Sequence, residues 1–118
     1  MPITSLQSAL AAFAHQRDWE QFHNPKNLVM ALAGEAGELT AEFQWLSAEQ
    51  SQAVMDDPLK AEAVRQEMAD VFAYLLRLAD VLGVDLEQAL EDKIALNAEK
   101  YPVEKAYGTA AKYTDLEQ

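Results

Sequence analysis

The feature that most constrains the fold is an apolar repeat at helical spacing in two long segments, residues 24–46 and 59–82. Apolar residues recur there every three or four positions, which is the spacing of one face of an α-helix. The two stripes comprise Leu28, Leu32, Ala36, Leu39, Phe43 and Leu46 in the first segment, and Ala61, Val64, Met68, Phe72, Leu75, Ala79 and Leu82 in the second. Because no β-alternation of useful length is present, the sequence predicts an all-α fold, a four-helix bundle.

Local signals predict where four helices begin and end. The expected ranges are 4 or 5 to 18, 24–46, 59–82 and 85 to about 101. Thr4 or Ser5, Asn24 and Asp85 are favourable N-caps, Pro25 is favoured at the first helical position, and Gly83 suits a helix end. Residues 47–58 are polar and are expected to form a loop with room for one short helical turn. Residues 103–118 show little periodicity, so an extended arm or tail is expected there.

Composition limits the function classes that fit the chain. The 118 residues are expected to form a single domain, 1–118, and so small a helical protomer favours assembly into a homo-oligomer. A net charge of −11 repels phosphate backbones, so nucleic acid is not an expected partner. The absence of cysteine excludes disulfides and thiol chemistry. With no signal peptide and no membrane-length apolar run, a cytoplasmic protein without a membrane partner is expected.

Two carboxylate pairs, each three residues apart, lie beside the apolar stripes. Glu35 and Glu38 belong to the first long helix, and Glu67 and Asp70 to the second. Residues three apart are neighbours on a helix surface, so packing of the stripes would bring the four carboxylates together. Glu42 lies on the same flank, one turn further on. Mg²⁺ relieves such repulsion and bridges carboxylates to substrate phosphates, so a metal site is predicted. Acid pairs are also common on solvated helix faces, and that alternative stays open.

Gly34 precedes this first carboxylate pair, and Gly37 lies between its two members in sequence. Each glycine costs a helix about 1 kcal/mol relative to alanine, which indicates close approach of a ligand or another backbone, or tight helix packing. A ferritin-like di-iron site needs a Glu-x-x-His motif on each of two helices, and of the two histidines, His15 and His23, only His23 follows a glutamate by three positions, so such a site is excluded. No phosphate-binding P-loop motif is present.

Several other residues are candidates to contact a nucleotide. Lys93, Asn97 and Lys100 follow one another at helical spacing, and Asn97 is expected to face apolar surroundings. The two lysines would contact phosphates, or would simply belong to a solvated face.

Aromatic residues offer surfaces on which a base could stack. Trp19, Phe22, Trp45 and Tyr74 are the candidates, and Trp45 is expected on a pocket wall because it lies away from the centre of its stripe. His23 is expected to order the turn before Pro25 rather than to take part in catalysis.

Taken together, several motifs resemble those of the MazG-like all-α nucleotide pyrophosphohydrolases, and most closely their dCTP pyrophosphatase branch. The resemblance covers roughly residues 5–116. It is carried by residues 18–28 (DWEQFHNPKNL), 34–39 (GEAGEL), 43–45 (FQW), 67–71 (EMADV), Asn97 with 100–102 (KYP), and 112–114 (KYT).

The resemblance implies a reaction and a set of site residues. The enzyme would hydrolyse dCTP or a modified dCTP to a monophosphate and pyrophosphate in nucleotide-pool house-cleaning, as a dimer or a dimer of dimers with sites at protomer contacts. The implied Mg²⁺ ligands, with Mn²⁺ as a substitute ion, are Glu35, Glu38, Glu67 and Asp70. The implied substrate-binding residues are Trp19, Trp45, Tyr74, Lys93, Asn97, Lys100 and Tyr101.

Two assignments stay open at this point. Among the four carboxylates, Glu38 is preferred as the base that activates water. Leu10 stands where the branch often has a histidine facing the base, so the preferred base is unsettled. The alternatives are dUTP, dATP, a damaged nucleotide or phosphoribosyl-ATP as substrate, or a non-catalytic nucleotide-binding interaction module.

Overall fold

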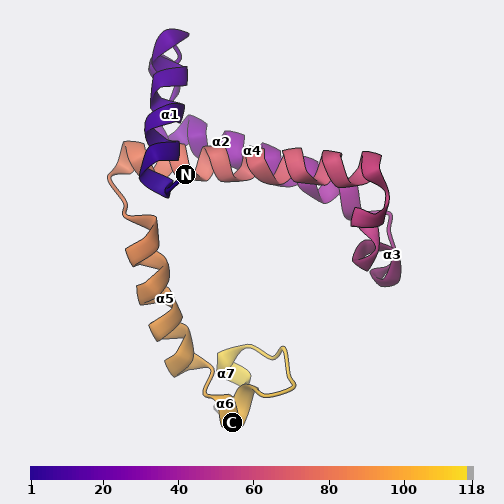
Figure 1. Ribbon diagram of the computed structural model, residues 1–118. Helices are drawn as coiled ribbons and strands as arrows, with labels where there is room; N and C mark the ends of the chain where they lie inside the picture. The colour runs from indigo at the N-terminus through magenta and orange to yellow at the C-terminus, as the bar shows by residue number, and fades with distance from the viewer. Residues whose placement is uncertain (117–118) are drawn as a thin grey trace. The chain divides into compact units, whose positions relative to one another are not determined.

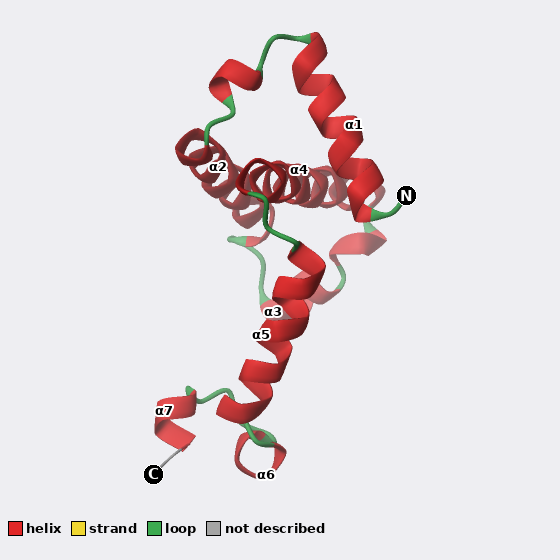
Figure 2. Ribbon diagram, turned by 90° about the vertical axis from the view of Figure 1, so that its left-hand side faces the viewer, coloured by secondary structure: helices red, strands yellow, loops and turns green. Residues whose placement is uncertain are grey.

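All regular structure in the described residues, 1–116, is helical in the computed structural model (Figures 1 and 2). The α-helices are α1 (Ile3–Gln16), α2 (Pro25–Phe43), α3 (Ala48–Gln52), α4 (Pro58–Leu82), α5 (Leu86–Lys100), α6 (Val103–Ala106) and α7 (Tyr113–Leu116), and the 3₁₀ helices are η1 (Glu20–Phe22) and η2 (Val54–Asp56). The predicted all-α class is confirmed. None of the helices among these residues is both long and apolar enough to cross a membrane.

Contacts within the chain divide it into two compact units, Met1–Gly83 and Val84–Gln118. The first unit contains α1 to α4, and the second contains α5 to α7. A single domain spanning all 118 residues stays a prediction.

The first unit is built on the pairing of α2 with α4, which lie side by side along their lengths, while α1 crosses α4 (Figures 1 and 2). Gln7 of α1 donates a hydrogen bond to the carbonyl of Leu76 in α4 at 3.0 Å, which fixes this crossing. The buried core residues are Ala14, Leu28, Val54, Val64, Leu76 and Ala79.

Side-chain caps explain most of the helix boundaries. Asn24 accepts a hydrogen bond from the Asn27 amide at 2.9 Å, and Asp85 accepts one from the Gln88 amide at 3.1 Å. Both were predicted as N-caps, and both satisfy amides that the first helical turn leaves free. Gly83 ends α4 with a φ of 70°, the left-handed conformation that glycine adopts at low cost.

The predicted boundaries were wrong at both ends of α1 and at the end of α2. α1 begins at Ile3, with Pro2 at its N-cap and no side-chain cap, so neither Thr4 nor Ser5 caps it. It ends at Gln16, because Asp18 has a φ of 54° and cannot continue a right-handed helix. α2 ends at Phe43, three residues before the predicted end.

Two segments without apolar periodicity contain more helix than was predicted. In residues 47–58 the Ser47 hydroxyl accepts from the Gln50 amide at 3.1 Å, and the Gln50 side chain accepts from the Ser47 amide at 2.9 Å. This capping box starts α3, which η2 follows. Residues 103–116, expected as an arm or tail, contain α6 and α7, while residues 117 and 118 of that tail lie outside the described residues.

The apolar stripe of α4 is only partly covered within the chain. Val64 and Ala79 are buried as predicted, but Met68 and Phe72 remain 57% and 43% exposed. Leu76, which lies outside the predicted stripe, is instead 2% exposed. The helix therefore has two apolar sides, and the first unit covers only one of them.

Candidate metal and nucleotide site

The facing surfaces of α2 and α4 hold a cluster of carboxylates. Glu35 and Glu38 come from α2 and Glu67 comes from α4, and one carboxylate oxygen of each lies within 4.8 Å of the others. The spacing of three residues places the two α2 carboxylates on one face, and the pairing of the helices brings the third to them. The predicted convergence of acidic flanks is thus present in the structure.

Burial and mutual repulsion raise the pKa of two of these carboxyls. For Glu35, burial raises the pKa most, followed by the close approach of Glu38 and then by the charges of Asp70 and Glu67. For Glu67, burial is again the largest cause of the raised pKa, with contributions from Glu38, Asp70 and Glu42. Asp70, the fourth predicted member, is therefore near enough to act on both.

The donor set fits a hard divalent cation. The Oε2 atoms of Glu35 and Glu67 are buried, and neither has a hydrogen-bond partner among the described residues. A buried polar atom without a partner is costly, and a bound cation would satisfy it. Because all the donors are carboxylate oxygens, the site suits Mg²⁺ or Mn²⁺ better than a metal that prefers nitrogen or sulfur ligands.

A lysine that was not predicted as a site residue borders the carboxylate cluster. Lys60 of α4 places its Nζ 3.3 Å from Oε2 of Glu42 and 3.4 Å from the Glu42 carbonyl. The ion pair offsets the charge of this fifth carboxylate and joins the end of α2 to the start of α4. Sequence offered no signal for it, because the partners are eighteen residues apart.

A cavity of about 170 Å³ adjoins the carboxylates, since Asp70 also lines it. Its apolar wall comes largely from α1, and its polar groups come from α4 and the turn around η1. The lining residues are Leu10, Phe13, Ala14, Trp19, His23, Asp70, Ala73, Tyr74 and Arg77. Two predicted stacking residues, Trp19 and Tyr74, therefore lie together beside the carboxylates.

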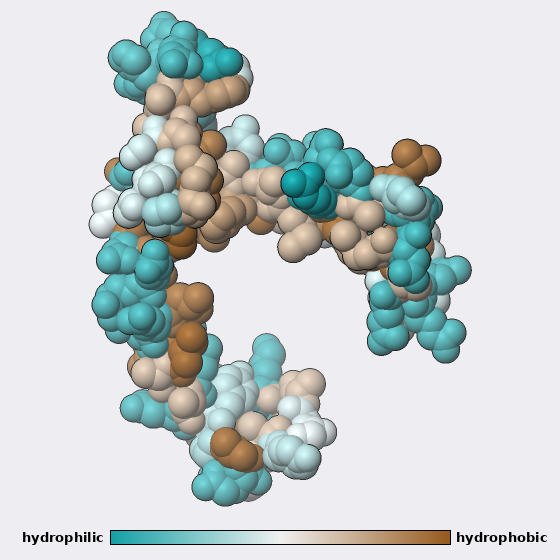
Figure 3. Space-filling model, in the orientation of Figure 1, coloured by the Kyte–Doolittle hydropathy of each residue, from teal (hydrophilic) through white to brown (hydrophobic). Residues whose placement is uncertain are grey.

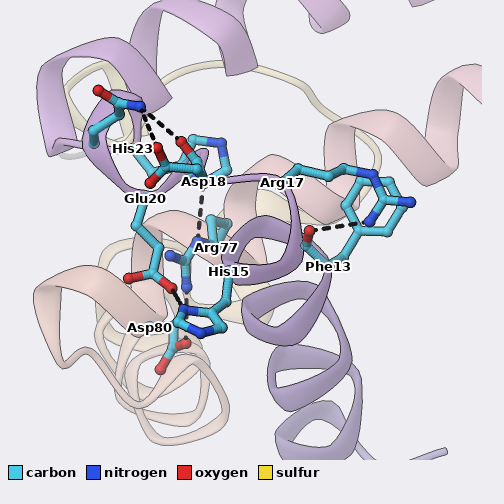
Figure 4. Close-up of polar contacts among 9 residues, drawn as sticks. Phe13, His15, Arg17, Asp18, Glu20, His23, Arg77 and Asp80 are labelled. Atoms are coloured by element: carbon cyan, nitrogen blue, oxygen red, sulfur yellow. Dashed lines mark hydrogen bonds and ion pairs between the residues drawn. The ribbon is translucent and has the colours of Figure 1, made fainter.

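Two polar residues of this cavity, His23 and Arg77, were not predicted as site residues. Nε of Arg77 donates a hydrogen bond to Nδ1 of His23 at 3.1 Å, and Nη1 of Arg77 lies 3.5 Å from Oδ2 of Asp80 (Figure 4). Burial, and then the positive charge of Arg77, lower the pKa of His23. The helical spacing of Asp70, Tyr74 and Arg77 was a usable signal for Arg77, because it places all three on one side of α4.

Trp45 does not lie where the sequence analysis expected it. It follows the end of α2 and is 87% exposed, so within the described chain it forms no pocket wall.

The remaining predicted substrate contacts belong to the second unit. Lys93 and Asn97 are exposed on α5, and the apolar surroundings expected for Asn97 stay a prediction. The apolar residues next to it on that side, Leu90 and Ile94, are themselves 61% and 60% exposed. Figure 3 shows hydrophobic surface along α5.

Lys100 and Tyr101 of the second unit both contact Tyr113. The Lys100 ammonium lies 5.0 Å from the centroid of the Tyr113 ring, within the range of a cation–π interaction. The Tyr101 and Tyr113 rings meet edge to face at 6.1 Å. These contacts tie the segment around α7 to the end of α5.

The glycines beside the carboxylates have open surroundings. A Cβ built at Gly34 or Gly37 would meet no atom of the described residues within 4 Å. Tight helix packing within the chain therefore does not account for them, which leaves a ligand or a second chain.

Comparison with known proteins gives consistent results. The sequence profile of the MazG-like family matches residues 31–116. The chain is 47% identical to dCTP pyrophosphatase 1 of Mus musculus over 106 residues, and 42% identical to that of Homo sapiens over the same length. Each match covers 90% of this chain but 62% of the mammalian protein, so the chain spans less than two thirds of these relatives.

A solved structure supports the same relationship. The fold matches the crystal structure of a pyrophosphatase from Archaeoglobus fulgidus with a TM-score of 0.78 and 35% sequence identity, over 84% of this chain and 91% of the archaeal one. Because the family profile spans well over half of the chain and includes both carboxylate pairs, the chain belongs to the MazG-like family.

Proposed function

We propose that the protein is a Mg²⁺-dependent nucleoside triphosphate pyrophosphohydrolase that cleaves dCTP or a modified dCTP to a monophosphate and pyrophosphate. The observation that carries this proposal is the group formed by Glu35, Glu38 and Glu67, two of which have buried oxygens without partners, beside a cavity with aromatic walls. The names of the mammalian and archaeal relatives support the reaction, and the mammalian ones support the base. Removal of unwanted nucleotides from the pool would be its role.

In this scheme the carboxylates hold the metal, and the chain supplies orientation and a base. Glu35, Glu38, Glu67 and Asp70 would be ligands, and bound Mg²⁺ would neutralise the triphosphate and lower the pKa of a bound water. Glu38 is the exposed member of the three-carboxylate group, so water can reach it, and it would take a proton from the attacking water. Attack at the α-phosphorus would release pyrophosphate.

The cavity beside Asp70 would hold the nucleoside. Trp19 and Tyr74 offer aromatic surfaces to the base, and the α1 wall excludes water from it. Lys93, Asn97, Lys100 and Tyr101 of the second unit, together with Trp45, are proposed to complete the substrate contacts on the strength of the family resemblance.

The active form is proposed to be a homodimer or a dimer of dimers. Met68, Phe72 and Leu75 of α4 are 57%, 43% and 37% exposed, and they lie one helical turn apart on one side. Full burial of such a side chain contributes about 1.5–3 kcal/mol, so covering this row with a second copy would be favourable. No nucleic-acid or membrane partner is proposed, and the proposed compartment is the cytoplasm.

Phosphorus NMR tests the reaction directly. The protein is incubated with each deoxynucleoside triphosphate and its ribo counterpart, first with Mg²⁺ and then with EDTA. We expect monophosphate and pyrophosphate from dCTP or a modified dCTP, and no turnover with EDTA. Diphosphate with orthophosphate would contradict attack at the α-phosphorus.

A matched pair of variants tests the site. Glu67→Gln removes a proposed ligand and should lower kcat/KM by about a hundredfold or more, because several kcal/mol of charge stabilisation are lost. Glu62→Gln changes an exposed glutamate on the same helix and should have little effect. Equal activity of the two variants would refute the assignment. Tight nucleotide binding by the wild type without turnover would instead favour a binding module.

A further inference from the structure

We propose that Lys60 binds the terminal phosphate of the nucleoside triphosphate, and that Glu42 positions the Lys60 ammonium until this phosphate displaces it. The proposal rests on the proposed function and deepens it, because it names a residue that distinguishes a triphosphate from a nucleotide with fewer phosphates. Neither residue lines the cavity beside Asp70, and neither is one of the four predicted metal ligands.

The contacts between α2 and α4 place Lys60 at one end of the acidic face. Midway along the two helices, Glu35 and Glu38 of α2 approach Glu67 of α4. At the end of α2 and the start of α4, Lys60 Nζ donates to Oε2 of Glu42 at 3.3 Å. Residue numbers thus rise along α2 as they fall along α4, so the two helices are antiparallel, and α3 lies between them in the chain at the Lys60 end (Figure 1).

The nucleoside cavity adjoins the opposite end of the acidic face. It is lined by Asp70, Tyr74 and Arg77, which follow Glu67 along α4, and by residues of α1. Lys60 precedes Glu67 by seven residues, which places the two on one side of the helix and about 10 Å apart along its axis. A nucleotide with its base in the cavity and its α-phosphate at the carboxylates would have its outer phosphates on the Lys60 side, because the phosphates lead away from the base.

The Lys60 ammonium can exchange its partner at low cost. Its contacts with Oε2 and with the carbonyl oxygen of Glu42 are 3.3 and 3.4 Å long, which is longer than most hydrogen bonds from nitrogen to oxygen. An ammonium has three donors, so one of them has no partner among residues 1–116. The Lys60 side chain is 41% exposed, so a ligand in solvent can reach it. An ion pair as exposed as this one contributes little to stability.

Lys60 is the basic residue of α4 that is bonded to a carboxylate of α2. Of the other two basic residues of this helix, Arg65 pairs with Glu62 of α4 itself, and Arg77 donates to His23 beside η1. A terminal phosphate carries about two negative charges and a carboxylate carries one, so the phosphate is the stronger partner for the ammonium. Once transferred to the phosphate, Lys60 would also offset the charge of the departing pyrophosphate.

Calorimetric titration tests the contact without relying on turnover. The probes are the α,β-imido analogues of dCTP and dCDP, which resist cleavage and differ only in the third phosphate, each added with Mg²⁺. Lys60→Met should weaken binding of the dCTP analogue about tenfold and that of the dCDP analogue less than about twofold. Arg65→Met removes the same charge from an exposed position of α4 and should change neither. Equal weakening of both analogues by Lys60→Met, or no weakening, would overturn the proposal.

A double-mutant cycle tests whether Glu42 acts through Lys60. Glu42→Gln keeps the shape of the side chain and releases the ammonium, so it should tighten binding of the dCTP analogue about threefold. In the Lys60→Met background the same change should have less than about half of that effect, because no ammonium is left to release. Equal tightening in both backgrounds would show that Glu42 acts only by repelling the phosphates, and would overturn its positioning role.

Kinetics and stability complete the test. Lys60→Met should lower kcat/KM for dCTP about tenfold, and Lys60→Arg, which keeps the charge, should recover most of the loss. Urea denaturation should show nearly the stability of the wild type for both variants; a large loss of stability with no selective loss of the dCTP analogue would assign Lys60 a structural role and overturn the proposal. If the wild type binds the dCTP analogue but hydrolyses no nucleotide, the proposed function fails, while the titrations still decide the role of Lys60.

Discussion

Replacing Gly37 with alanine should make the protein more stable and the enzyme less active. A glycine inside a helix costs about 1 kcal/mol relative to alanine. Nothing among the described residues lies within 4 Å of a Cβ at Gly37, and its φ is in the ordinary helical range, so no clash or strain offsets the gain. The free energy of unfolding should therefore rise by about 1 kcal/mol, roughly a fivefold change in the folding equilibrium.

Urea denaturation gives this difference directly, provided that the slope with denaturant stays constant. The matched control is Ala33→Gly, since Ala33 is exposed on the same helix and should lose stability by a similar amount. If Gly37→Ala were less stable than the wild type, a group that packs against this position within the chain would be required, and the reasoning would be refuted.

The activity of the same variant shows why the glycine is there. Gly37 precedes Glu38 in sequence, and no atom of the described residues lies within 4 Å of a Cβ at this position, so an added methyl group would meet whatever ligand or second chain covers this part of α2. We expect kcat/KM for dCTP to fall while stability rises. Light scattering separates the two remaining explanations, because a glycine needed for a second chain would also change the mass of the assembly. A stabilised variant with unchanged activity and mass would show that neither ligand nor partner needs the glycine.

Two further predictions concern stability. The pKa values of Glu35 and Glu67 are raised in the folded state, so as the pH falls the folded protein binds protons at a higher pH than the unfolded protein does. In EDTA, the free energy of unfolding contributed by this site should therefore increase as the pH falls from neutral towards the ordinary glutamate pKa of about 4.3. The free energy of unfolding of the wild type minus that of a variant with both residues changed to glutamine isolates the effect, and a difference that decreases over this range would contradict the sign. Leu28→Ala should cost about 2–5 kcal/mol in denaturant titrations, because Leu28 is 1% exposed, whereas Leu59→Ala, at an 85% exposed position, should change stability by less than about 0.5 kcal/mol.

Local chemistry made the main helices predictable from the sequence, and competition between local signals accounts for the errors. Asn24 and Asp85 cap helices through contacts within three residues, and Gly83 ends one by its own conformation. The end of α2 was missed because the apolar spacing continues to Leu46, while the capping box that begins at Ser47 starts a new helix. Apolar periodicity alone does not show which of two overlapping signals the chain follows.

The parts of the candidate site that depend on local helical spacing were likewise predictable, and the contacts between distant residues were not. The carboxylate group follows from residues three apart on two helices that pair, so sequence spacing was enough to locate Glu35, Glu38 and Glu67. The contact between His23 and Arg77 joins residues 54 positions apart, and no spacing rule reaches that far. Trp45 lies beyond the end of α2 and is 87% exposed, so no contact within the described residues holds it as a pocket wall, and its place in the site stays a prediction.

The carboxylate group and the two neighbouring glycines lower the stability of the folded chain when no ligand is bound. Two carboxyls have raised pKa values and buried oxygens without partners, and the neighbouring glycines lower helix stability with no packing in return. The well-packed core around Leu28 and Leu76 shows no such features. Costs concentrated on one face are expected where a ligand relieves them, because a ligand that binds only the folded state stabilises it by about 2.7 kcal/mol at one hundred times its dissociation constant. The energetics and the geometry thus support the same proposed role for this face, which is to hold a cation.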